Sequence, residues 1–68
     1  MNSSLLKGEI RSRDLTQEDV AASIGLSLSR FNAKINSKNE AEFSLGEVKA
    51  IRNLFGLTPE QVDQIFFK

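Results

Sequence analysis

Helix-start and helix-stop signals follow one another along this 68-residue chain at intervals too short for long helices. Ser44, with Glu47 three residues later, forms a capping box, and Gly56 ends the helix that this box opens. Thr58 before Pro59 places a cap residue ahead of a proline at the first helical position. None of the resulting segments is long enough to be stable alone in water, so these helices must pack on one another.

The earlier part of the chain carries three further start signals, so five helices are expected in all. The first begins at a cap within residues 2–4. Thr16, followed by Asp19, approximates a capping box and opens the second, which Gly25 ends, and Ser27 caps the third. The apolar side chains expected on the inner faces are Leu5, Leu6, Ile10, Val20, Ala21, Ile24, Leu28, Phe31, Ile35, Leu45, Val48, Ile51, Phe55, Val62, Ile65 and Phe66.

Signals for β-strands are absent, since the chain has no two-residue hairpin turn and no sustained alternation of apolar and polar residues. A chain of 68 residues suffices for one small core. The predicted fold class is therefore a compact all-α domain that spans residues 1–68, with an irregular loop at residues 37–43.

The chain has no cysteine and no histidine, which removes disulfides, thiolate ligands, the commonest metal ligand and the commonest general base. Its serines are explained as helix caps, and its carboxylate pairs as solvated surface charges. We therefore predict no enzyme activity, no catalytic residue, no metal site and no cofactor. No apolar run exceeds three residues, so we expect neither a membrane span nor a signal peptide, and an intracellular location.

The formal net charge of zero conceals an uneven distribution. Residues 1–38 hold six basic and four acidic side chains, whereas residues 39–68 hold three and five. A neutral chain lacks the bulk positive charge of a nucleic-acid coat protein. Any contact with nucleic acid must therefore rely on a local basic patch.

The third helix is the place where such a patch is expected. On a helical wheel, Phe31 and Ile35 fall on one side and form a core stripe. Arg30 and Lys34 fall on the opposite side, and Lys38 continues the row at the same interval of four. This spacing predicts a basic ridge along the exposed side of the helix.

The segment from Gln17 to Asn36 resembles the helix-turn-helix signature of phage Cro and CI-type repressors, and the flanking "LTQ", "NSK" and "FGLTPEQVDQIFF" agree with the same family. The resemblance implies a five-helix lambda-repressor-like domain whose second and third helices form the helix-turn-helix. It also implies a regulator that binds operator DNA in the lysis/lysogeny decision, in the cytoplasm of a bacterial host. The chain is most similar to short Cro-like or modulator-of-repression proteins of temperate phages of Gram-positive bacteria. The matching positions within the motif are Val20, Ala21, Ile24, Gly25, Leu26 and Phe31.

The resemblance also assigns roles to single residues. Gln17 would meet a DNA phosphate, and Ser27 would cap the recognition helix and touch the DNA backbone. Four positions of that helix would face base edges, and two residues beyond them would hold phosphates. Arg30 and Lys34 have charges that suit phosphate or, for Arg30, a guanine edge. The complete predicted DNA-binding set is Gln17, Ser27, Leu28, Ser29, Arg30, Asn32, Ala33, Lys34, Asn36 and Lys38, of which Leu28, Ser29, Asn32 and Ala33 are base-facing and Asn36 and Lys38 hold the backbone.

Departures from the family pattern leave a second function open. Leu28 and Ala33 are apolar and Ser29 is short, so these positions make few paired hydrogen bonds with bases. Glu40 and Glu42 lie where relatives often carry basic residues. The alternative partner is the phage's own CI-type repressor protein, whose DNA binding this chain would alter. Both activities are compatible with one protein.

A further open question concerns Phe67. On a straight helix it cannot face the same way as Val62 and Ile65, so it is a candidate contact for a weak homodimer. The alternative is that it folds back onto the small core. The family resemblance favours the dimer, because such proteins commonly bind two-fold symmetric operators.

Overall fold

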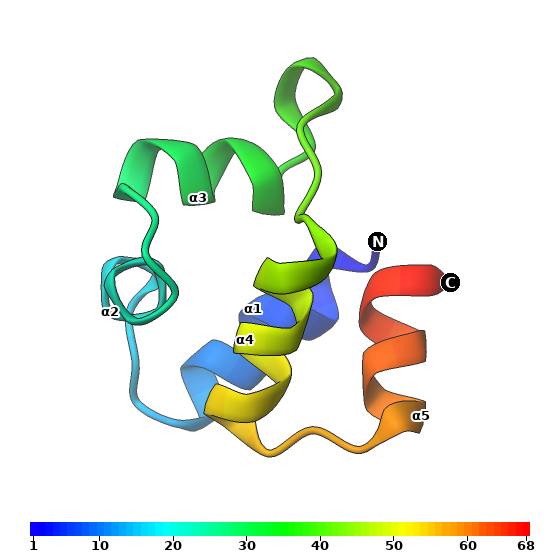
Figure 1. Cartoon of the computed structure of the whole chain (residues 1–68). Coiled ribbons are helices and arrows are strands. Elements are labelled where there is room, and N and C mark those ends of the chain that lie inside the picture. Colours follow the sequence, from blue (N-terminus) through cyan, green and yellow to red (C-terminus); the bar gives the residue numbers. More distant parts are fainter.

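The computed structural model describes every residue from Met1 to Lys68, and all of its regular structure is helical (Figure 1). The predicted all-α class with five helices is therefore confirmed. No helix combines the length and apolar character needed to cross a membrane. The elements are α1 (Ser3–Ser12), α2 (Gln17–Ser23), α3 (Leu28–Ile35), a 3₁₀ turn η1 (Lys38–Glu40), α4 (Leu45–Phe55), α5 (Pro59–Val62) and a π-helical turn η2 (Asp63–Phe67).

Local caps explain where the helices begin. The Thr16 hydroxyl accepts the Asp19 N–H at 3.1 Å, and the Asp19 carboxylate accepts the Thr16 N–H at 2.8 Å. Ser44 and Glu47 form the same reciprocal pair at 3.2 and 2.9 Å. For α1, the cap among residues 2–4 is Asn2, whose side chain accepts the N–H three residues on. Each pair satisfies N–H groups that a helix terminus leaves free.

The turn between α2 and α3 depends on Gly25, whose φ of +79° lies in the left-handed region. Its N–H donates to the Ala22 carbonyl at 3.3 Å, and the Leu26 N–H donates to the Ala21 carbonyl at 2.9 Å. This paired closure is the Schellman motif, which favours glycine at the left-handed position. In Figure 1, α2 is seen end-on while α3 runs across the view, so the two helices cross steeply.

One core of ten buried side chains lies between the helices. Phe31 and Ile35 are completely buried, as predicted. Leu5, Leu28 and Leu45 are exposed by 44%, 43% and 71%, so the prediction that they lie on inner faces is wrong. Each step of three residues turns by about 60° around a helix, so Leu45, two such steps before buried Ile51, lies about 120° away from it and outside the buried side of α4. Leu5 lies about 100° from buried Leu6 on the helical wheel, and Leu28, in the first turn of α3, lines an open hollow with Gln17. Val48 is buried as well, outside this core. The ten core residues are Leu6, Ile10, Val20, Ala21, Phe31, Ile35, Ile51, Phe55, Leu57 and Ile65.

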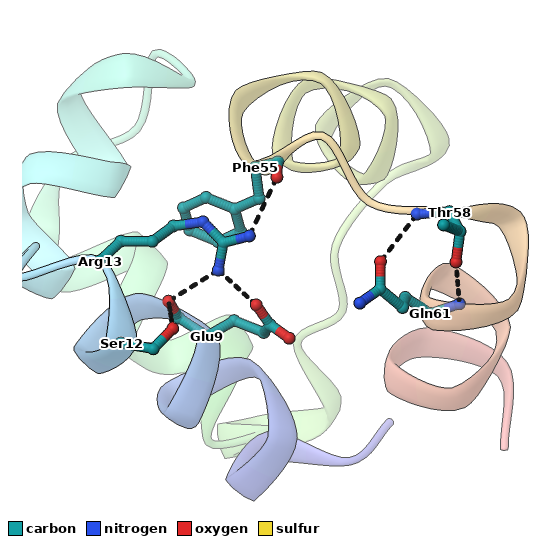
Figure 2. Close-up of polar contacts among 6 residues, drawn as sticks. All are labelled: Glu9, Ser12, Arg13, Phe55, Thr58 and Gln61. Carbon is teal, nitrogen blue, oxygen red and sulfur yellow. Dashed lines mark hydrogen bonds and ion pairs between the residues drawn. The ribbon is translucent and has the colours of Figure 1, made fainter.

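Arg13 joins the end of α1 to the end of α4 (Figure 2). Its guanidinium donates to the Phe55 carbonyl at 3.0 Å, to the Glu9 carbonyl at 3.1 Å and to the Glu9 carboxylate. It also lies over the Phe55 ring, 4.6 Å from the ring centre. The same view shows a capping box of Thr58 and Gln61 at the start of α5. These contacts fix the chain at the point where it leaves α1 toward the α2–α3 unit.

The predicted loop at residues 37–43 contains η1 and three residues with left-handed backbone, of which Asn39, with φ of +52°, lies inside η1. Ser37 and Glu40 both have left-handed backbone, with φ of +52° and +64°. The loop ends at Phe43, whose ring packs edge-on against Phe31 at 5.4 Å and against Phe66 at 6.0 Å between ring centres. This row of rings holds the end of the loop against the core.

The fifth helix is regular only from Pro59 to Val62 and then widens into η2. Ile65 is buried, while Val62 and Phe66 pack against the core from its edge. Phe67 is 60% exposed and, in contrast to Ile65, is not part of the core, but it shares one hollow with Phe66 and another with Val62. The Asn2 N–H donates to the Ile65 carbonyl at 2.6 Å, so the two ends of the chain lie side by side (Figure 1).

Candidate nucleic-acid interface

α3 is held to the domain by its inner side and by its C-terminal end. Phe31 and Ile35 anchor its inner face, and the Ser3 hydroxyl donates to the Ile35 carbonyl at 2.6 Å. The hydroxyl thereby satisfies a carbonyl at the helix end that has no partner within the helix. Residues 28–30 are exposed. The outer side of α3 is therefore free to approach another molecule.

Six of the ten predicted site residues line one open hollow beside α3. Its polar side chains come from the start of α2, from α3 and from η1, so three successive elements build it. No carboxylate lines this hollow. The small side chains of Ser29 and Ala33 leave room for another molecule to come close to α3. The lining residues are Gln17, Leu28, Ser29, Asn32, Ala33 and Lys38.

A chain of hydrogen bonds crosses this hollow. The Lys38 ammonium donates to Oδ1 of Asn32 at 3.3 Å, and Nδ2 of Asn32 donates to Oε1 of Gln17 at 3.5 Å. The Nε2 group of Gln17 has no partner within the molecule. The hollow thus presents the amide donors of Gln17 and the ammonium of Lys38, which suit a ligand that can only accept hydrogen bonds, such as a phosphate.

Arg30 is the free cation on α3. It is exposed, and its guanidinium forms no hydrogen bond or ion pair within the molecule. Its backbone N–H donates to the Ser27 hydroxyl at 3.2 Å, which confirms Ser27 as the cap of α3. That hydroxyl keeps its own hydrogen for a second contact.

Lys34 does not lie on an exposed ridge, so that prediction is wrong. Its ammonium donates to both carboxylate oxygens of Glu47, at 2.6 and 2.9 Å, and its side chain is only 15% exposed. Burial opposes ionisation of Glu47, but hydrogen bonds from Lys34 and the Ser44 N–H, with the charge of Lys34, lower its pKa overall. Lys34 therefore joins α3 to α4 instead of facing a partner.

Lys38 also leaves the predicted row, and Asn36, which was predicted to hold a DNA phosphate, contacts α1 instead. The left-handed turn at Ser37 ends the helix and directs Lys38 back over α3 toward Asn32. Oδ1 of Asn36 accepts the Lys7 ammonium at 2.9 Å, on the side of α3 that faces α1. Sequence reasoning missed Lys7. The only local signal was a basic residue within the predicted first helix, because the contact spans 29 residues and depends on how α1 and α3 pack.

Glu42, one of the two acidic residues at positions where relatives often carry basic ones, does not line the hollow beside α3. It lines a different hollow at the ends of the chain, together with Phe66, Phe67 and Lys68. Glu40 is exposed on η1. The acidic loop therefore leaves the polar side chains next to α3 without a carboxylate neighbour in their hollow.

Comparisons of this chain with known protein families, with characterised proteins and with solved structures find no match. The geometry of α2 and α3 and the chemistry of the surface that they carry are therefore the only guides to function.

Proposed function

We propose that this protein is a transcriptional regulator of the phage Cro/CI type, which binds operator DNA with α3 in the major groove. One observation carries the proposal. A tight Gly25 turn joins α2 to a helix that Phe31 and Ile35 anchor to the core and Lys34 ties to α4. The first turn of this helix is exposed, and the hollow beside it presents hydrogen-bond donors and no carboxylate. A helix carried in this way fits the major groove of B-DNA.

We assign some side chains of this surface to base contacts and others to phosphate contacts. Leu28 and Ala33 are suited to the methyl groups of thymine, and Arg30 to a guanine edge or a phosphate. Gln17 and Lys38 donate to phosphates and fix the position of α3. Asn32 orients both of these donors through its two hydrogen bonds. Few paired hydrogen bonds reach the bases, so DNA shape contributes to the choice of operator.

The test is selection from a random pool of duplexes, followed by fluorescence anisotropy of the recovered DNA across a salt series. We expect enrichment of a palindrome and an affinity that falls with salt. Arg30→Gln should weaken binding by at least tenfold. Lys49→Gln is the matched control, because it removes one exposed cation on α4 and should leave affinity unchanged. Absence of binding at low salt, with a folded protein, would contradict the proposal.

A second candidate partner is a CI-type repressor protein of the same phage. It is favoured by the exposed apolar side chain of Leu28 next to the small residues Ser29 and Ala33, and by the removal of Lys34 into an ion pair. A surface of this kind buries well against another protein. Mixing the two proteins and following operator binding by the repressor distinguishes this function, since a modulator changes that binding without touching DNA itself.

A further inference from the structure

We infer that α1 extends the DNA-contacting surface beyond the helix-turn-helix, and that Lys7 and Arg11 bind DNA phosphates. This inference rests on the proposed function and adds two residues to it. Neither residue belongs to the DNA-binding set predicted from the sequence.

The first support is continuity of the surface. A second hollow is lined by Lys7, Ile10, Arg11, Leu15 and Gln17. Gln17 also lines the hollow beside α3. The two hollows therefore meet at the start of α2, and a DNA backbone that contacts Gln17 lies next to both cations of α1.

The second support is the way in which the two cations are held. The Lys7 ammonium donates to Oδ1 of Asn36 at 2.9 Å, which keeps it beside the end of α3 and leaves two of its hydrogens free. Arg11 is exposed, and its guanidinium has no partner within the molecule. Lys7 and Arg11 are four residues apart, so they lie one above the other on the same side of α1.

The third support is charge. No carboxylate lines either of the hollows that share Gln17. Two other hollows of the molecule contain Glu42 and Asp63 respectively. In a chain with nine basic and nine acidic residues, this separation collects Lys7, Arg11 and Lys38 around one polar surface. Such a surface attracts a polyanion although the molecule as a whole is neutral.

These contacts are assigned to phosphates because both cations lie on α1, outside the helix that would enter the groove. Phosphate contacts fix the position of a protein on DNA and carry no sequence information. Each one releases about one counterion, which sets the slope of log affinity against log salt. Loss of Lys7 or Arg11 should therefore weaken binding equally on every sequence.

The test compares Lys7→Gln, Arg11→Gln and the double variant with a control of equal charge, Lys49→Gln with Arg52→Gln on α4. Anisotropy across a salt series is measured on the selected operator and on a random duplex. We expect the slope to fall by about 1 for each single variant and about 2 for the double, with a roughly tenfold loss per residue at 50 mM salt. The control should keep the parent slope.

The charge-retaining variants Lys7→Arg and Arg11→Lys should keep the slope, and circular dichroism verifies that each variant is folded. If the double variant does not fold, the single variants decide. An unchanged slope in the glutamine variants, while the parent binds DNA, overturns this inference alone. A change in the preferred DNA sequence also overturns the inference, because it would show that Lys7 or Arg11 contacts base edges and not phosphates. Absence of DNA binding by the parent overturns the inference and the proposed function together.

Discussion

At the scale of single residues, substitution of Lys34 should change mainly stability, whereas substitution of Arg30 should change mainly DNA affinity. Lys34→Met keeps the apolar stem but leaves Glu47 without its counter-ion, so it should lower the free energy of unfolding by about 1–2 kcal/mol. Its DNA affinity should stay within about twofold of the parent. Arg30→Gln should weaken DNA binding and leave the free energy of unfolding unchanged, because Arg30 has no partner within the molecule to lose. Urea denaturation and anisotropy on the same samples measure both effects, and a large loss of DNA affinity in Lys34→Met would contradict this assignment.

The same pair predicts a dependence of stability on pH. Glu47 has a pKa below its ordinary value of 4.5 in the folded protein. Its ionised form therefore stabilises the fold fully above about pH 4.5, and the contribution is lost as the pH falls through the lower folded-state pKa. Denaturation at pH 6 and pH 3 should show a larger loss for the parent than for Lys34→Met. Asp19, whose pKa is lowered by the Thr16 N–H, titrates alike in both proteins. Equal losses would show that the pair contributes nothing.

At the scale of elements, the loop after α3 carries an identifiable strain. Ser37 holds a left-handed conformation, with φ of +52°, that costs a residue with a Cβ atom about 1–2 kcal/mol. Ser37→Gly should therefore raise the free energy of unfolding by about 0.5–1 kcal/mol after the entropy of glycine is counted. Ser4→Gly, at an exposed helical position in α1, should lower it by about 0.5 kcal/mol. Thermal melts of the two variants should thus move in opposite directions, and a loss in both would contradict the explanation.

The second prediction at this scale is that substitutions on the two faces of α3 differ in their effect on stability. Phe31 is completely buried between the helices and Leu28 is 43% exposed. Phe31→Ala should cost roughly 3–5 kcal/mol, which is comparable with the whole stability of a chain this short. Leu28→Ala should cost about 0.5 kcal/mol, while weakening any contact made through the outer face. Circular dichroism melts decide, and equal melting temperatures would show that the faces are assigned wrongly.

The helices could be predicted from the sequence because their boundaries are set locally. Thr16 and Asp19, like Ser44 and Glu47, are three residues apart, so each capping pair is visible in a short window. The contacts that define the candidate site are different in kind. Lys34 meets a residue 13 positions away and Lys7 one 29 positions away, so each depends on how whole helices pack. Periodicity showed that Phe31 points inward, but it could not show that Glu47 would draw Lys34 from the surface.

At the scale of the whole molecule, a neutral chain is organised into surfaces of different character. One side gathers Lys7, Arg11, Lys38 and Gln17 around two hollows without carboxylates. The hollow at the chain ends is lined by aromatic rings and Glu42, and exposed Phe67 lies there. The homodimer through Phe67 stays a prediction, and sedimentation of the parent and Phe67→Ser tests it. This organisation allows DNA binding on one side while a second contact forms on another.

The most direct test of the central claim is NMR mapping of backbone amide shifts as a short duplex is added at low salt. The proposed function predicts shifts for Gln17, for residues 28–33 and for Lys38, and none for α4 or for the hollow that contains Glu42 and Phe66. Shifts confined to that hollow, or no shifts while the protein is folded, would contradict the claim that α3 is the surface of this protein that binds DNA.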